Sequence, residues 1–178
     1  MPTIVSHPAL PFAVGLGLGP QAIRPPLIAA GIVASILPDL DVVAFRLGIP
    51  YAAEFGHRGF SHSLFCAALV ALLATWGFRR FHCGAWNAFG FLFLSMASHG
   101  ALDALTNGGQ GVALLWPFDQ TRYFAPLRII EVAPLSLDRL FTPRGITVLA
   151  SEFKWIWLPA GVLCVLLVWL RRRQPSSI

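Results

Sequence analysis

The sequence predicts an all-α protein that is integral to a membrane: a helical bundle of about three full spans preceded by an N-terminal helical hairpin. Charged residues make up only 12% of the 178 residues, against about 25% in ordinary domains, and 56% are hydrophobic. A soluble fold of this size needs more polar side chains to cover its surface. The mean hydropathy is +0.69, and the six Trp residues belong to a type that is enriched at membrane interfaces.

Two short apolar runs come first, at residues 9–18 and 27–37. A Gly-Pro and a Pro-Pro dipeptide lie between them, and both interrupt helices. We interpret the two runs as an N-terminal helical hairpin that either spans the bilayer with help from its flanks or inserts only partly. Because Pro38 disfavours a helical conformation at Leu37, the second arm is expected to end there.

Three longer apolar segments are each predicted to span the membrane: 63–78, 85–102 and 155–170. All three are slightly short for a hydrocarbon core of about 30 Å, so flanking residues are expected to complete each crossing. The first segment ends at two arginines (79–80). The last runs directly into three arginines (171–173), as a stop-transfer segment does.

The region between the last two predicted spans has a different composition. Residues 110–154 contain several prolines and all four acidic residues that follow Asp103. We therefore predict a loop-rich segment or a small cap at 110–154. Residues 1–178 are taken as one membrane-embedded domain, in which 155–170 is the last transmembrane helix and 171–178 a basic tail.

The arginines set the expected orientation. Because cytoplasmic loops are enriched in Lys and Arg, we place the arginine pair at 79–80 and the C-terminal tail in the cytoplasm. Threading the chain then puts all eight acidic residues at the outer, periplasmic face of the inner membrane. The net charge of +5 does not predict a nucleic-acid partner, since the arginines are scattered and form no basic stripe with aromatic residues.

A helix-spaced pair ends the second predicted span. His99 and Asp103 are four residues apart, so on a helix they lie on one face, one turn apart. An imidazole nitrogen and a carboxylate oxygen placed in this way share a metal ion, or the carboxylate orients the imidazole. An isolated pair of this kind is more often a capped helix end, but ionisable groups in a membrane helix are costly and usually functional.

A second polar group precedes the first predicted span. On a continuous helix His57 and His62 would point in different directions. Gly59 permits a break in that helix, and Ser61 is a favourable N-cap for a helix that begins at His62. With His57 in a loop and His62 in the first helical turn, both imidazoles face one centre. The alternative is an interfacial loop of ordinary polar residues.

Asp39 and Asp41 follow Pro38 at the end of the predicted hairpin. In an extended segment both would project to the same side, whereas on a helix they would diverge and only one would be a ligand. The alternative is a helix-terminating turn, in which Pro and Asp are common. His7 lies near the N-terminus, and the hairpin would return it to the same face.

Seven candidate donors thus converge at one face. Their mixed nitrogen and oxygen atoms suit Zn²⁺, with Mn²⁺ or Fe²⁺ as alternatives, and the three cysteines are expected to be packing thiols. One four-ligand structural site would leave donors over, so we expect an open catalytic site of one or two ions. The predicted metal ligands are His7, Asp39, His62, His99 and Asp103. The predicted catalytic residues are Asp41, His57 and Arg58. Within the pairs Asp39/Asp41 and His57/His62 the sequence leaves open which member binds the metal directly.

Two further arginines lie in the loop-rich segment. Arg122 and Arg128, together with Arg58, are predicted to clamp a phosphate or to stabilise developing negative charge. For each of them the alternative is an interfacial side chain that binds lipid headgroups.

The order of these motifs resembles a known family. His7, PDLD at 38–41, HRGFSHS at 57–63 and SHGALDALTNGG at 98–109, followed by WPF at 116–118, are similar to the YdjM-like family of bacterial inner-membrane proteins. The resemblance covers roughly residues 1–131. It implies a metal-dependent hydrolase in the inner membrane.

The succession of His, Asp, His and HxxxD also resembles the zinc-dependent phospholipase C and P1 nuclease superfamily. This resemblance implies zinc ligands at His7, at Asp39 or Asp41, at His57 or His62, and at His99 and Asp103. The chain lacks the second HxxxD and the N-terminal Trp of that superfamily. Their absence puts a three-metal cluster in doubt and favours one or two ions.

The predicted function is hydrolysis of a phosphoester by metal-activated water, on a small molecule or on a lipid that reaches the site laterally from the bilayer. A lipid phosphatase that works through phosphohistidine ranks lower, because the Lys-rich and PSGH-type motifs of such enzymes are missing. The non-enzymatic alternative is a metal-binding or metal-transporting membrane protein. Transport favours ligands at mid-membrane, whereas these lie at helix ends.

Overall fold

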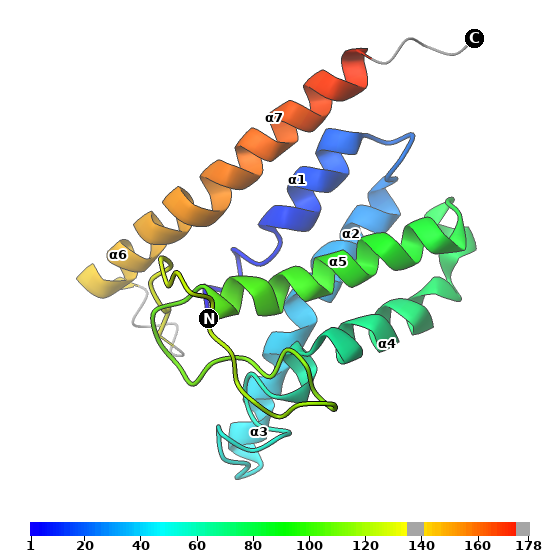
Figure 1. Cartoon of the computed structure of the whole chain (residues 1–178). Coiled ribbons are helices and arrows are strands. Elements are labelled where there is room, and N and C mark those ends of the chain that lie inside the picture. Colours follow the sequence, from blue (N-terminus) through cyan, green and yellow to red (C-terminus); the bar gives the residue numbers. More distant parts are fainter. Residues whose placement is uncertain (135–140, 174–178) are drawn as a thin grey trace.

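The computed structural model describes residues 1–134 and 141–173, and within them the protein is all-helical, as the sequence predicts (Figure 1). The described part contains no strand, only isolated bridges between Thr106 and Ile130 and between Val112 and Tyr123. Residues 135–140 of the predicted cap and 174–178 of the predicted basic tail lie outside the described residues. The elements in chain order are α1 (Ala9–Leu18), α2 (Pro25–Ile36), η1 (Leu37–Val42), α3 (Val43–Arg46), η2 (Phe60–His62), α4 (Leu64–Thr75), η3 (Phe78–Phe81), α5 (Ala85–Ala104), α6 (Pro143–Glu152), η5 (Phe153–Trp157) and α7 (Leu158–Arg173).

The N-terminal hairpin is formed by α1 and α2, and α1 has the predicted bounds. The second arm differs from the prediction. Pro25 opens α2, where the missing N–H of a proline is not needed. The chain then continues through the 3-10 helix η1 into α3, so Pro38 tightens the helix without ending it. The result is one 22-residue apolar helix, Pro25–Arg46, long enough to cross a membrane.

The last helix is longer than predicted. It runs over 31 residues from Pro143 to Arg173 and contains both the predicted span 155–170 and the end of the predicted loop-rich segment. The prediction of a loop up to residue 154 is therefore wrong from Pro143 onward. The reason is that α6 is amphipathic: Gly145, Val148 and Glu152 are buried along one face, and its polar composition belongs to the other face.

Two of the three predicted spans are not matched by helices of comparable length and apolarity. α4 has 12 residues, from Leu64 to Thr75. α5 has 20 residues but carries polar side chains in its last third, including His99 and Asp103. Among the described helices, only Pro25–Arg46 and Pro143–Arg173 are long and apolar enough to cross a membrane. Three full spans are therefore not established.

The helices pack in two groups that meet at α2 and α5 (Figure 1). α1 lies along α7, and α5 packs against α4 and α2. Small side chains allow the helices to approach closely: Ala67, Ala71 and Ala88 are fully buried in the α2–α4–α5 core. At Gly31 of α2 an added Cβ would lie 2.4 Å from the ring of Phe91 on α5, so the glycine is required for this contact.

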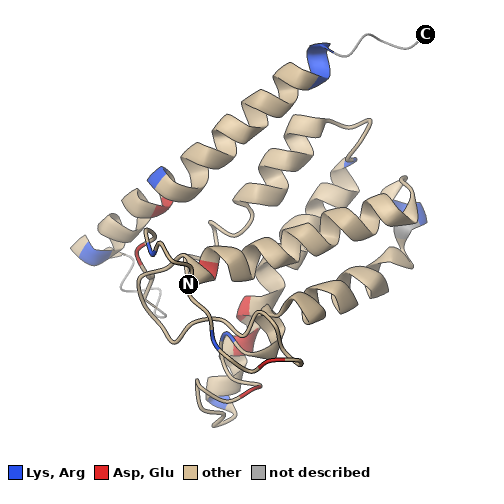
Figure 2. Ribbon diagram, in the orientation of Figure 1, with Lys and Arg blue, Asp and Glu red and all other residues tan. Residues whose placement is uncertain are grey.

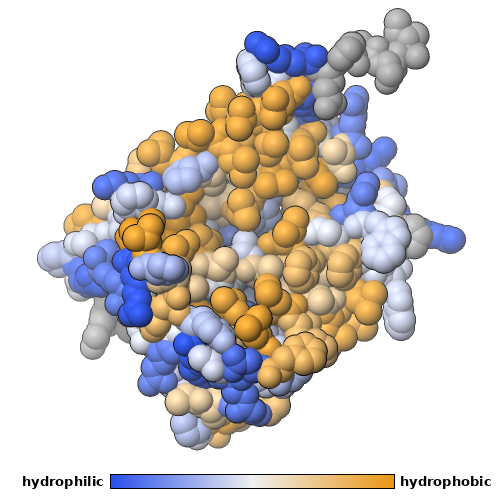
Figure 3. All heavy atoms as spheres, viewed as in Figure 1, coloured by the Kyte–Doolittle hydropathy of each residue, from blue (hydrophilic) through white to orange (hydrophobic). Residues whose placement is uncertain are grey.

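The surface has the pattern expected of a membrane protein. Large apolar side chains of α4 and α7, such as Leu72 and Val165, are exposed, and they form a broad hydrophobic surface (Figure 3). Acidic residues gather at the helix ends near the N-terminus, whereas arginines mark the end of α7 and the turn between α4 and α5 (Figure 2). Trp76 and Trp86 flank that turn and are 85% and 84% exposed, as is typical of an aromatic belt.

Candidate metal centre

Four separate segments deliver the polar side chains to one buried cluster. His7 precedes α1, Asp39 and Asp41 belong to η1, and the third segment carries His57 in a loop and His62 at the end of η2. The fourth segment is α5, with His99 and Asp103. All seven side chains are buried, at 4% exposure or less. The structure therefore brings together all seven candidate donors that the sequence suggested.

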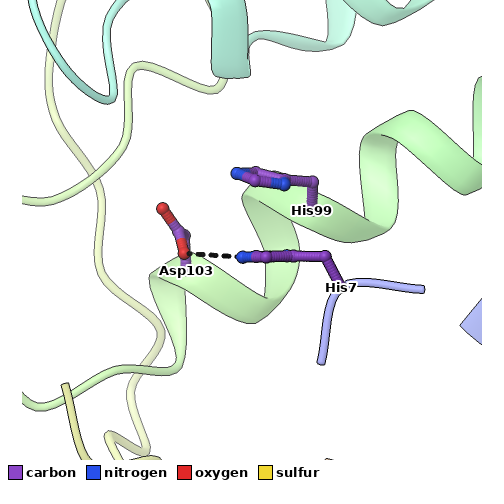
Figure 4. Close-up of side chains that lie close together, drawn as sticks. All are labelled: His7, His99 and Asp103. Atoms are coloured by element: carbon purple, nitrogen blue, oxygen red, sulfur yellow. Dashed lines mark ion pairs between the residues drawn. The ribbon is translucent and has the colours of Figure 1, made fainter. Parts of the chain in front are cut away.

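α5 provides the base of the cluster. His99 and Asp103 lie one turn apart on the same face, and His7 stacks on the His99 ring with a centroid distance of 3.6 Å (Figure 4). Nε2 of His7 then lies 3.8 Å from Oδ1 of Asp103. Nδ1 of His99 lies 2.7 Å from the carbonyl oxygen of Ser35. This contact places the His99 proton on Nδ1 and directs the lone pair of Nε2 into the cluster.

Five side chains form a closed ring, and they are the five predicted metal ligands. Nε2 of His99 lies 3.0 Å from Nε2 of His62 and 3.3 Å from Oδ1 of Asp39. Oδ2 of Asp39 lies 3.7 Å from Nε2 of His7, and the same nitrogen faces Oδ1 of Asp103. Oδ2 of Asp103 closes the ring at 3.4 Å from Nε2 of His62. Two ligands bound at 2.0–2.1 Å in a tetrahedral zinc site are about 3.3 Å apart, so the separations fit shared coordination.

The two carboxylates divide this ring into two poles. Asp39 and Asp103 each turn one oxygen to the pair His62–His99 and the other oxygen to His7. His99 has only one free nitrogen, so it would ligate a single ion. The ring therefore offers a first pole with two imidazoles and a second pole with His7, and bridging carboxylates would join two ions.

Three of the five ring residues, His7, Asp39 and Asp103, lack hydrogen-bond partners for their side-chain nitrogens and oxygens. Six of the seven buried side-chain atoms without a hydrogen bond in the described residues are both ring nitrogens of His7 and both oxygens of Asp39 and of Asp103. The seventh is Nε of Arg58, which lies 3.0 Å from Oδ2 of Asp103 as an ion contact. Each buried carboxylate that is left without hydrogen bonds costs about 1–3 kcal/mol or more. A cation bound inside the ring would satisfy these atoms.

The charge balance leads to the same conclusion. Three carboxylates, from Asp39, Asp41 and Asp103, are buried here, and Arg58 contacts one of them. The amino group of Met1 lies 4.0 Å from Asp103. These two cations leave the cluster one positive charge short, and buried carboxylates require countercharge.

Protons take this role when no metal is bound. Burial disfavours protonated His62, but the neighbouring carboxylates of Asp103 and Asp41 outweigh burial and raise the pKa of His62 to about 9. Burial, and after it the closeness of the His99 imidazole, lower the pKa of His7. A metal ion bound at this ring would therefore displace the His62 proton, because only the neutral imidazole is a ligand.

Asp41 lies on the other side of His62 and is held by four donors. Oδ1 is 2.5 Å from Nδ1 of His57. Oδ2 accepts from Ser61 Oγ at 2.7 Å and from the backbone N–H of Arg58 at 3.1 Å, and lies 3.1 Å from Nδ1 of His62. The His62 ring thus faces Asp41 with one nitrogen and the metal ring with the other, the usual arrangement of a carboxylate that orients a metal-binding imidazole.

The structure decides between the two alternatives for Asp39 and Asp41 and corrects one local prediction. Both aspartates lie in the helical segment η1, so they diverge and point to different partners. Both nevertheless reach the cluster, because His62 lies between them. The N-cap of α4 is Ser63, whose Oγ accepts from the N–H of Cys66 at 3.0 Å, whereas the predicted cap Ser61 donates to Asp41.

The three predicted arginines differ in their positions. Arg58 is fully buried, and beside its Asp103 contact it donates to Gly108 O at 3.0 Å and to Thr106 Oγ1 at 3.1 Å. Its guanidinium is therefore committed to the protein. Arg122 is half-buried and donates to the carbonyls of His57, Tyr51 and Ala53.

Arg122 thus stabilises the loop that carries His57. Arg128 is exposed and stacks over Phe124, 3.8 Å from the ring centroid, so the structure does not bring it into the cluster. The predicted phosphate clamp is not assembled by these arginines.

Gly100 allows His62 to approach α5. An added Cβ at Gly100 would lie 2.7 Å from the backbone oxygen of His62, whereas Gly90 on the same helix has nothing within 4 Å. Gly100→Ala is therefore expected to lower the free energy of unfolding by about 1–3 kcal/mol, while Gly90→Ala leaves it unchanged or raises it. Thermal unfolding of the two variants checks this; equal behaviour would contradict the tight contact.

Sequence reasoning missed two residues near the cluster. Ser35 fixes His99 through its carbonyl oxygen, which no sequence pattern indicates. Glu152 is a buried carboxylate bonded to the segment before His7. The sequence does contain an indication of Glu152, because an acidic residue beside an apolar span is energetically costly and usually has a role.

The chain is similar to inner membrane proteins over almost its whole length. A family model described as YdjM inner membrane protein matches residues 1–175. The inner membrane protein YbcI of Escherichia coli is 48% identical over 97% of the chain and is itself covered completely. The inner membrane proteins YdjM of Escherichia coli and Shigella flexneri are 37% identical over 75% of the chain, with 66% of their own length covered. No solved structure matches.

Proposed function

Because the chain belongs to the YdjM family of inner membrane proteins, we propose a function at the membrane: metal-dependent hydrolysis of a phosphoester. The observation that carries the proposal is the buried ring of His7, Asp39, His62, His99 and Asp103, with its unsatisfied carboxylate oxygens. These five side chains would hold one or two ions, with zinc best suited to the donor set. A divalent ion bound there would lower the pKa of a water molecule and would polarise a phosphoryl oxygen of the substrate.

His57 is suited to move a proton. Its Nδ1 is held by Asp41, and this is the hydrogen bond that the described residues make to the His57 ring. An imidazole whose one nitrogen is fixed by a carboxylate offers the other nitrogen as a general acid or base. His57 lies beside His62, with ring centroids 5.6 Å apart, and so acts next to the metal ring.

Asp41 and Arg58 act through other residues in this proposal. Asp41 orients both His57 and His62, and Arg58 fixes Asp103. The sequence suggested both as catalytic residues, but the contacts of both are with protein groups. We therefore assign them positioning roles.

A groove of about 460 Å³ supports a lipid as the substrate. It lies between η1–α3 and η2–α4, and its lining is apolar except for Asp41 and Ser61. Exposed apolar side chains such as Leu40 and Leu47 surround it. An acyl chain entering laterally from the bilayer would rest on this apolar lining, with the polar end of the lipid beside Asp41 and its neighbour His62.

The proposed topology places the cluster on the periplasmic side. The arginines at 79–80 and 171–173 lie at the helix ends away from the cluster, and positively charged ends stay in the cytoplasm. We expect a reporter active only in the cytoplasm to be active when fused to the C-terminus. Activity only of a periplasmic reporter at this position would overturn the orientation.

The test of function combines metal analysis and turnover. Purified protein is expected to retain zinc and to hydrolyse a phosphodiester, with phosphatidylglycerol in mixed micelles turned over faster than bis(p-nitrophenyl) phosphate. Chelation with EDTA should remove the activity, and added zinc should restore it. Protein without zinc would overturn the proposal. Zinc without turnover of either substrate would favour the alternative of a non-catalytic metal-binding or metal-transport protein.

A further inference from the structure

Glu152 forms a buried clasp between the last membrane helix and the N-terminal segment. The side chain is 1% exposed and lies where α6 joins η5. Its Oε1 accepts from the backbone N–H of Thr3 at 2.5 Å, and its Oε2 accepts from Oγ1 of Thr3 at 2.6 Å and from Oγ of Ser6 at 2.6 Å. Trp157 donates its indole N–H to Oγ of Ser6 at 3.1 Å. Helix and segment are thus joined by a compact polar network.

The clasp ends one residue before His7. The N–H of Ser6 donates to the carbonyl of Thr3 at 2.9 Å, so the clasped residues form a closed turn. His7 follows directly and is fully buried in the ring. Any displacement of this turn would move the His7 imidazole.

His7 differs from the other histidines in how it is oriented. His99 is fixed through Ser35, and both His57 and His62 are fixed through Asp41. Neither nitrogen of His7 has a hydrogen-bond partner in the described residues. A metal-binding imidazole normally has such a partner on its second nitrogen. The position of His7 must therefore come from stacking on His99 and from its backbone.

Glu152 lacks a cationic partner among the described residues, so it is not half of a surface ion pair. A buried carboxylate at the edge of a membrane helix is costly and is usually retained for function. Hydrogen bonds to a charged acceptor are the strong ones, and three of them converge here. The energetic cost of burying Glu152 is explained if its carboxylate fixes the position of the segment that precedes His7.

We propose that Glu152 is a positioning residue of the metal centre, which fixes His7 at the second pole of the ring by clasping Thr3 and Ser6. The proposal rests on the metal centre proposed above and not on its hydrolytic activity. A protein that binds zinc and cleaves nothing would leave Glu152 in this role while the proposed enzyme failed.

The test is zinc titration of the purified full-length protein. Glu152→Ala is expected to weaken binding at the His7 pole by about 10–100-fold, as His7→Ala does, while zinc at the His62–His99 pole is retained. Glu152→Gln keeps an acceptor oxygen and should bind zinc nearly as the wild type does. In the double variant with His7→Ala, Glu152→Ala should cause no further loss.

Glu131→Ala is the matched control, since this carboxylate is partly exposed and pairs with Arg144, and it should leave zinc binding unchanged. If Glu152→Ala does not fold, Ser6→Ala removes one of the three donors and should give a smaller loss at the same pole. Wild-type zinc affinity in a folded Glu152→Ala protein overturns the proposal. Additive losses in the double variant, or a wild-type protein that binds no zinc, overturn it as well.

Discussion

Replacing Asp103 by asparagine is expected to lower the zinc affinity more than a hundredfold and to destabilise the protein. The carboxylate faces His62 with one oxygen at 3.4 Å and His7 with the other at 3.8 Å, so it serves both poles of the ring. Asparagine has a similar size but offers one neutral acceptor. Removing one partner of a buried ion pair also leaves Arg58 without countercharge, at a cost of about 3–5 kcal/mol.

The two effects can be separated by a second substitution. Arg58→Met in the Asp103→Asn background removes the unpaired buried cation, so part of the stability should return, as seen in thermal unfolding. Zinc binding should not return, because the ligand is still missing. Asp119→Asn makes the same change at a loop carboxylate that accepts from Thr121 and should keep the zinc. A folded Asp103→Asn protein with wild-type zinc content would exclude the ring as the metal centre.

Local spacing explains why part of the site could be predicted. The four-residue interval between His99 and Asp103 fixes their relation on any helix, and α5 places both on one face of the cluster. The hairpin returns His7 to the same end because α1 and α2 are antiparallel neighbours. Both inferences need only the helical period and the direction of the chain.

The choice between Asp39 and Asp41 could not be made from the sequence. A proline usually excludes the α conformation from the residue before it, yet Leu37 has φ −52° and ψ −40°. Packing of the continuous apolar helix outweighs that local preference. In a 3-10 helix the two aspartates differ by about 240° in direction, and this difference sends Asp39 into the ring and Asp41 to the outer side of His62.

The arginines and Glu152 depend on contacts between distant segments. Arg58 is 45 residues from Asp103 in the chain, and its role as an ion partner follows only from the fold. Composition alone predicted a loop around Glu152. The many polar residues on one face of α6 made the segment look loop-like, although its other face is buried. The sequence identifies charged residues in a membrane protein as energetically costly. It does not show whether such a residue binds the substrate or another group of the protein.

His57 provides the prediction that distinguishes an enzyme from a metal-binding protein. His57→Gln is expected to retain zinc within about twofold, because His57 lies outside the ring and its partner Asp41 keeps the contact with His62. Hydrolysis of the phosphoester should fall by about 10²–10⁴-fold, the usual contribution of a general acid or base. The measurements are zinc content and turnover on the same preparation.

His82→Gln is the matched control, because His82 is exposed beside the arginines at 79–80, at the far end of α4 and α5. It should change neither zinc content nor turnover. Equal loss of zinc and turnover in His57→Gln would make His57 a ligand and would move Asp41 and His57 into the metal centre itself. Full turnover in His57→Gln would exclude it as the proton-transfer group, and the reaction would then depend on the ring alone.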